Sequence, residues 1–189
     1  LYPGALTVFI GPCLAKKAEA REKDLAGDVD YVLTFQEVAS IFRLLGIDPA
    51  AQAEDDKEHA SRAGRIYARA GGVSEAVSAT VARLNPARKI RVKTVKADGV
   101  PACKAMINDI LSGEVKGNFY EGMGCKGGCV GGPRSVVPPD EGARAVNTYG
   151  EQSPYETPAE NPYVIELLHR LGYDRIEDLL RHSDIFTRT

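Results

Sequence analysis

Short apolar runs alternate along this chain with longer segments of helical periodicity. Residues 6–10 form such a run, rich in β-branched side chains, and it stops at Gly11-Pro12, which predicts a buried strand leading into a loop. Residues 31–33 repeat the pattern and predict a second strand. Residues 13–21 lie between the two and consist mainly of helix formers after a proline, so we expect a short helix there.

Longer helical patterns follow the second strand. Thr34 and Glu37 have the spacing of a capping box and predict the start of an amphipathic helix. Residues 49–70 are polar and dense in charge, which predicts an exposed excursion without a regular apolar face. Apolar positions then recur at helical spacing over residues 73–84 and alternate over residues 89–95, which indicates a helix followed by a strand.

The remaining pattern completes an alternation of strands and helices. We expect a helix over residues 101–111 and a strand over residues 118–123. Residues 133–160 hold several prolines around a short helical segment, and residues 163–171 and 176–180 repeat at helical spacing. This order predicts an α/β fold with a parallel or mixed sheet flanked by helices, formed by residues 1–189 as one domain or lobe.

Composition and charge narrow the function classes. The 189 residues are 43% apolar, enough to bury the core of one domain or a large lobe. A net charge of −2, with basic residues scattered among acidic ones, argues against binding to nucleic acid or to an anionic membrane surface. No apolar run approaches the roughly 20 residues of a membrane span, and the start lacks a basic signal region, so we expect a cytoplasmic location. Because the chain begins with Leu1, we expect it to be a piece of a longer protein.

The cysteines follow the ends of predicted strands, the place where ligands usually bind in α/β folds. Cys13 lies at the start of the first helix, where the helix dipole and nearby Lys16 favour a thiolate. Cys125 and Cys129 flank a loop whose two glycines can take positive φ, let the thiolates converge and turn backbone N–H groups toward an anion. This arrangement suits an iron–sulfur cluster.

Other metal chemistry remains an alternative. Zinc knuckles more often use two intervening residues and two cysteine pairs, whereas this chain has three intervening residues and one pair. The fourth cysteine, Cys103, lies in a predicted helix, and we interpret it as a small buried residue. It is also the one further cysteine that could complete a four-cysteine zinc or cluster site with Cys13, Cys125 and Cys129.

Two motifs resemble those of [FeFe]-hydrogenases. Residues 12–19 (PCLAKKAE) resemble the PCxxKxxE motif, and residues 121–132 (EGMGCKGGCVGG) resemble the ExMxCxxGCxxGG motif, in the same order. The resemblance covers residues 6–132 and implies the C-terminal part of an iron-only hydrogenase H-cluster domain. Residues 133–189 would then be a proline-rich and helical extension.

The resemblance assigns the cysteines to a cofactor. It implies that Cys13, Cys125 and Cys129 hold the [4Fe–4S] part of the H-cluster, and that Cys129 also bridges to the di-iron subcluster. The fourth ligand would come from an N-terminal lobe that this chain lacks. The complete protein would interconvert protons, electrons and H2 and exchange electrons with a ferredoxin-like carrier, while the piece alone would be without cofactor and inactive.

Three further residues receive roles from the same motifs. Lys16 is implied to donate to a cyanide ligand of the di-iron unit, Glu19 to belong to the proton path, and Met123 to pack beside the di-iron unit. Each also has an ordinary interpretation. Lys16 and Glu19 have the spacing of a surface ion pair, and Met123 can fill a core.

Several positions depart from the family motifs. Gly11 stands where methionine is usual, Lys126 replaces a common proline, and the last motif continues as Gly-Gly-Pro-Arg. These departures favour a second hypothesis, a non-catalytic sensory or assembly-factor-like iron–sulfur protein. Retention of Lys16 and Met123 beside the cysteines argues for the hydrogenase.

Overall fold

The strands form two separate parallel pairs. The computed structural model describes residues 4–53 and 59–182. Its pairs are β1 (Val8–Gly11) with β2 (Tyr31–Thr34), and β3 (Thr94–Asp98) with β4 (Phe119–Met123). The predicted α/β fold with parallel strands is therefore confirmed, with two small sheets in place of one.

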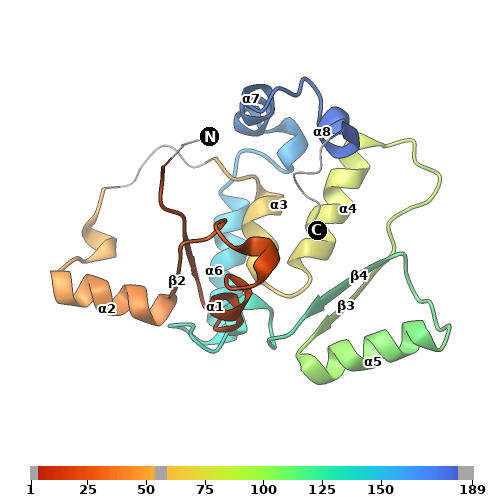
Figure 1. The fold of residues 1–189 in the computed structure, drawn as a ribbon. Coiled ribbons are helices and arrows are strands. Elements are labelled where there is room, and N and C mark those ends of the chain that lie inside the picture. The colour runs from red at the N-terminus through yellow and green to blue at the C-terminus, as the bar shows by residue number, and fades with distance from the viewer. Residues whose placement is uncertain (1–3, 54–58, 183–189) are drawn as a thin grey trace.

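Helices separate and cover these sheets (Figure 1). The α-helices are α1 (Ala15–Glu19), α2 (Phe35–Leu45), α3 (Arg62–Arg65), α4 (Gly72–Leu84), α5 (Val100–Leu111), α6 (Pro139–Glu151), α7 (Pro162–Arg170) and α8 (Ile176–His182). Short 3-10 turns lie at Lys23–Leu25, Pro49–Ala51, Ile66–Ala68, Cys129–Gly131 and Pro158–Glu160.

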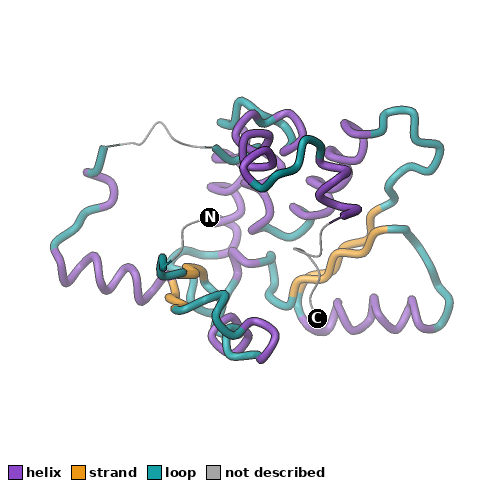
Figure 2. The backbone as a smooth tube through the Cα atoms, turned by 45° about the horizontal axis from the view of Figure 1, so that its top comes forward, coloured by secondary structure: helices purple, strands orange, loops and turns teal. Residues whose placement is uncertain are grey.

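The elements fall into three groups (Figures 1 and 2). Helices α4 and α5 cover opposite sides of the β3–β4 pair, and α3 and α6 pack together in the centre. The β1–β2 pair lies on the other side of this centre, and α2 extends outward from it. The loops after β1 and β4 both turn toward the central helices.

Helix α2 shows how local sequence determines an element. The predicted capping box is present, since Glu37 N–H donates to Thr34 Oγ1 at 3.3 Å and Thr34 N–H donates to the Glu37 carboxylate at 2.7 Å. The Thr34 N–H, the Lys17 ammonium and the Thr34 hydroxyl lower the pKa of Glu37 to about 2. Gly46 ends the helix in the left-handed conformation.

The prediction that residues 49–70 form an exposed excursion is wrong for their second half. Residues 54–58 lie outside the described part, but Ser61, Ala63 and Ile66 are almost fully buried. The Arg65 guanidinium lies 4.1 Å from the centre of the Tyr149 ring and donates to the Tyr149 carbonyl at 2.8 Å. This charge-rich segment is buried because α6 supplies partners for its polar groups.

Two other boundaries differ from the sequence pattern. Strand β3 begins at Thr94, later than the predicted residues 89–95, because its register follows pairing with β4. Lys93 marks this start, where its N–H donates to the Asn118 side chain at 2.7 Å and its carbonyl accepts from the Asn118 N–H at 2.9 Å. Helix α6 spans 13 residues, longer than the short segment predicted there.

Much apolar surface is left uncovered. The total accessible surface is 13249 Å2, whereas a compact 20.4 kDa monomer exposes about 8,800 Å2. The first strand, predicted to be buried, is about half exposed at Val8 and Ile10, because β2 and α2 cover it only in part. Leu44 of α2 is 86% exposed.

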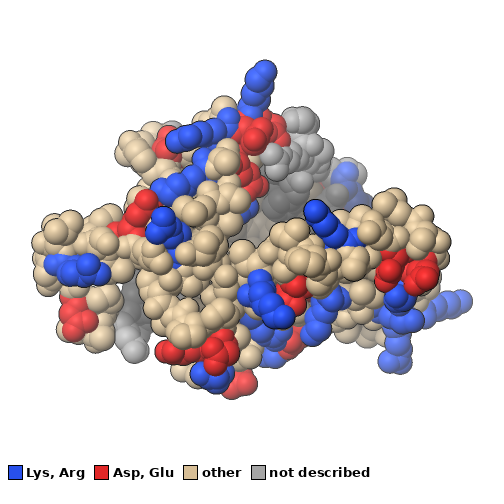
Figure 3. Space-filling model, turned by 90° about the horizontal axis from the view of Figure 1, so that it is seen from below, with Lys and Arg blue, Asp and Glu red and all other residues tan. Residues whose placement is uncertain are grey.

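Charged side chains of both signs are exposed on the surface. On the face shown in Figure 3, basic and acidic side chains are intermixed and no large area carries a single sign. Within the described residues, no helix is long and apolar enough to cross a membrane.

Candidate metal centre

The first cysteine loop connects β1 to α1. Cys13 is half-buried and lies two residues before the five-residue helix, which begins at Ala15. Lys16 and Glu19 of α1 form an ion pair, with side chains 43% and 35% exposed. The ordinary interpretation of this pair is thus realised in the structure, and any role toward a cofactor stays a prediction.

The second cysteine loop is a tight turn after β4. Gly128 N–H donates to the Cys125 carbonyl at 3.1 Å, and Gly127 has φ +82°, as the third residue of a type II turn requires. Gly128 has φ +87° and ψ −156°, a conformation almost confined to glycine. A Cβ there would lie 2.5 Å from Ala70 N and 2.7 Å from Met123 Sδ. The predicted positive φ of both glycines is confirmed.

The two cysteine loops meet at Pro12. After the turn at Cys129–Gly131, Arg134 N–H donates to the Pro12 carbonyl at 3.0 Å. A Cβ on the buried Gly132 would lie 2.8 Å from the same oxygen, so no larger residue fits without displacement. Pro12 and Cys129 also line one apolar pocket together with Phe35 of α2.

Cys13, Cys125, Cys129 and Lys16 share one electrostatic environment. Cys129 is exposed as a residue, but its thiol is partly covered, and this desolvation is the largest cause of its raised pKa. Negative charge on Cys125 and Cys13 raises the pKa further, and Lys16 lowers it. In residues 4–53 and 59–182, no three Cys, His, Asp or Glu side chains are already arranged as a metal site.

Cys103 lies apart from this group. It belongs to α5, is half-buried, and its sulfur lies 3.3 Å from the Met123 carbonyl oxygen and 3.6 Å from that of Ala97. Its charge is not among those that shift the Cys129 pKa. The structure thus places Cys103 in the predicted helix, less buried than expected, with its thiol occupied by backbone carbonyls.

The sequence did not identify two carboxylates that support the second cysteine loop. Glu121 of β4 is 5% exposed and accepts hydrogen bonds of 2.7 Å from the N–H groups of Gly71 and Ser74 at the start of α4. Asp98, the last residue of β3, accepts from Gly127 N–H. Gly127 N–H and Gly128 N–H both donate within the protein, so neither is directed toward an anion in this structure. The expectation that other backbone N–H groups of the loop face a bound anion stays a prediction.

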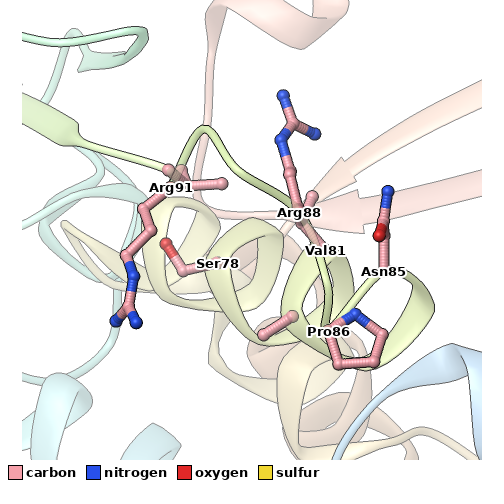
Figure 4. A pocket seen from close by; sticks show the side chains of 8 residues that line it. Ser78, Val81, Asn85, Pro86, Arg88 and Arg91 are labelled. Atoms are coloured by element: carbon pink, nitrogen blue, oxygen red, sulfur yellow. The ribbon is translucent and has the colours of Figure 1, made fainter.

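A larger pocket lies elsewhere, at the end of α4. Figure 4 shows Arg88 and Arg91 beside it with their guanidinium groups pointing in different directions. Its lining contains no thiol and none of the residues singled out by the motifs. Nothing in this pocket relates it to the cysteine loops.

A comparison with known protein families identifies the class of protein. Residues 3–133 match the family described as iron only hydrogenase large subunit, C-terminal domain, and the chain belongs to this family. A curated relative is the NADP-reducing hydrogenase subunit HndD of Solidesulfovibrio fructosivorans, 29% identical over an alignment of 226 positions. That alignment covers 97% of this chain and 38% of the relative.

Solved structures of [FeFe]-hydrogenases share the fold. HydA1 from Chlamydomonas reinhardtii superposes with a TM-score of 0.62 at 21% identity, over 92% of this chain and 61% of that one. HydA(deltaEFG) superposes with a TM-score of 0.59 at 21% identity, again over 92% of this chain and 61% of that one. The chain therefore spans less than two thirds of each of these proteins.

Proposed function

We propose that this chain supplies Cys13, Cys125 and Cys129 as three of the four thiolate ligands of the [4Fe–4S] part of an H-cluster, with Cys129 bridging to the di-iron subcluster. The meeting of the two cysteine loops carries the proposal, because Arg134 and Gly132 pack directly against Pro12. Loops that are more than 100 residues apart in sequence thereby meet, and charges on Cys13 and Cys125 act on the Cys129 thiol.

The donor set fits such a group. Soft thiolate ligands suit iron–sulfur clusters, and the mutual repulsion of several thiolates is relieved when cationic iron binds. Lys16 adds a positive charge that favours an anionic cluster. Three thiolates leave the fourth ligand position of a [4Fe–4S] cluster open. We assign that position to a cysteine from another segment, because the Cys103 thiol donates to the carbonyls of Met123 and Ala97.

The remaining motif residues have supporting roles. When bound, the H-cluster supplies the bond-making between protons, electrons and H2. The Lys16 ammonium would donate toward an anionic ligand of the di-iron unit, and Glu19, which forms an ion pair with Lys16 in the structure, would take up and release a proton on the path to solvent. Met123 packs its thioether beside the site, consistent with its position against the backbone of Gly128.

A further lobe completes the site in this proposal. The accessible surface exceeds that of a compact monomer by about half, and apolar side chains of β1 and α2 are exposed. We assign this surface to contact with an N-terminal lobe. The longer curated relative offers residues for such a lobe, since this chain covers only 38% of its length. Electrons would pass to a ferredoxin-like carrier in the cytoplasm, and the piece alone would be inactive.

One observation favours the non-catalytic alternative. At Gly11, where the family motif usually has methionine, a Cβ would lie 2.8 Å from the Phe9 ring. The aromatic ring therefore occupies space that a larger side chain at position 11 would need. Such a site would bind the cluster and sense H2 or redox state, or serve in cluster assembly, without rapid turnover.

The test is hydrogen-dependent viologen reduction by the complete gene product, matured anaerobically with hydrogenase maturation enzymes. Turnover that Cys129→Ser abolishes and Cys103→Ala leaves intact supports the hydrogenase. Bound iron and sulfide with negligible turnover supports the sensory or assembly-factor alternative. Metal that is zinc, and that is lost in Cys103→Ala, contradicts both and supports a four-cysteine module.

A further inference from the structure

The loop that carries Cys125 and Cys129 is attached to the rest of the protein mainly through Gly127 and Gly128. Within the described residues, both hydrogen bonds that tie residues 125–128 to other segments are made by Gly127. Its N–H donates to the Asp98 carboxylate, and its carbonyl accepts from Ala70 N–H at 2.8 Å. Gly128 also forms an antiparallel bridge with Arg69. The hydrogen bonds from Gly128 N–H to Cys125 and from Gly131 N–H to Gly128 are internal to the turn and the segment that follows.

Asp98 reaches Gly127 because two strands end together. In the β3–β4 pair, Asp98 lies opposite Met123, and Gly99 N–H donates to the Met123 carbonyl at 2.9 Å. The chain turns into the cysteine loop directly after Met123. The side chain at position 98 therefore lies next to the start of the cysteine loop. A carboxylate there is long enough to accept a hydrogen bond from Gly127 N–H.

Glu121 supports the second contact of Gly127, the hydrogen bond from Ala70 N–H to its carbonyl. The carboxylate of Glu121 accepts from Gly71 and Ser74, which fixes the turn that presents Ala70 N–H to the loop. Both attachments of Gly127 thus depend on an acidic side chain of the β3–β4 sheet. Charge-assisted hydrogen bonds of this type are about twice as strong as neutral ones.

The negative charge of Asp98 does not itself favour the proposed site. Thiolates and the sulfides of a cluster are anionic, so a nearby carboxylate opposes their charge. Its contact in the structure is the hydrogen bond to Gly127, and this bond requires an acceptor without requiring a charge. An asparagine at position 98 should therefore keep part of the function, whereas an alanine should not.

We propose that Asp98 is a positioning residue of the cluster site, whose side chain holds Gly127 so that the turn presents Cys125 and Cys129 together. The inference rests on the proposed function only for the identity of the bound group. The holding of the loop by Asp98 is a property of the chain itself. It can be measured without any metal.

The first experiment follows amide hydrogen exchange by mass spectrometry in the complete gene product, prepared without metal and kept reduced. Asp98→Ala should speed exchange of the Gly127 amide and its neighbours by at least about tenfold, the loss expected for a hydrogen bond to a charged acceptor. Asp98→Asn, whose amide oxygen is a neutral and weaker acceptor, should exchange more slowly than Asp98→Ala and faster than the wild type. Asp109→Ala, which removes an exposed ion pair with Lys116, is the matched control and should leave the loop unchanged.

Exchange over α4, which Glu121 holds, reports whether a variant is still folded. Faster exchange confined to the loop in Asp98→Ala, with partial rescue by Asp98→Asn, supports the proposal. Unchanged loop exchange in Asp98→Ala overturns it. Equal acceleration in Asp98→Ala and Asp98→Asn, with slow exchange over α4, also overturns it, because acceptor geometry would then not be the cause.

The second experiment measures how fast a chelator removes iron from the complete, matured protein. Asp98→Ala should release iron at least about tenfold faster than the wild type, and the rate of Asp98→Asn should lie between the two. Equal rates in the two variants contradict a role at the site. A wild type that binds no iron contradicts the proposed function and leaves the exchange experiment to decide on Asp98.

Discussion

Replacement of Glu121 by alanine should strongly destabilise the protein. Its carboxylate is 5% exposed and accepts two hydrogen bonds of 2.7 Å from backbone N–H groups at the N-terminal end of α4. Each hydrogen bond to a charged group contributes about 1.5–3 kcal/mol, and the variant leaves two buried donors without an acceptor. We therefore expect Glu121→Ala to lower the free energy of unfolding by about 3–5 kcal/mol.

Urea unfolding at pH 7, followed by far-ultraviolet circular dichroism, measures this change. With a urea dependence of about 2 kcal/mol per molar, the midpoint should fall by about 2 M. Glu114→Ala is the control, because that carboxylate is 63% exposed in its ion pair with Lys116 and should contribute less than about 0.5 kcal/mol. A midpoint shift below about 0.5 M in Glu121→Ala would refute the reasoning, since it would mean that the two N–H groups do not depend on this carboxylate.

Three further substitutions test other contacts. Because the pKa of Glu37 is lowered from 4.5 to about 2, its contribution is complete above pH 4.5 and is lost as the pH falls toward 2, so Glu37→Gln should flatten the acid loss of thermal stability between these values. Gly128→Ala should cost about 2–4 kcal/mol in urea unfolding, through backbone conformation and close contacts, whereas Gly124→Ala, with open space around it, should be nearly neutral. Lys16→Ala should change stability by less than about 1 kcal/mol, since its ion pair is solvent-accessible, and a larger loss would show that Lys16 is structural.

The elements that could be predicted from sequence are those determined by local interactions. Helix α2 has its capping box at Thr34 and Glu37 and its terminating glycine at position 46, all within one short segment. The turn between Cys125 and Cys129 was predictable for the same reason, because positive φ at adjacent glycines is a local property. The two family motifs also located both cysteine loops that the structure brings together at Pro12.

Features that depend on distant partners could not be predicted. Arg65 is buried because Tyr149, 84 residues later, accepts its hydrogen bond and stacks on it, and the charge pattern of residues 49–70 gives no sign of that. The role of Asp98 depends on where β3 ends, which is determined by pairing with β4 and not by the alternation of residues 89–95. The exposure of β1 likewise reflects which elements cover it and not its own apolar pattern.

The central claim is that three thiols of this chain hold an iron–sulfur cluster, and the most direct test is the iron and acid-labile sulfide content of the complete gene product matured without oxygen. Wild type and Cys103→Ala should contain equal amounts of both, and Cys13→Ser, Cys125→Ser and Cys129→Ser should each lose most of them. Full iron and sulfide in any of these three serine variants, or their loss in Cys103→Ala, would contradict the assignment.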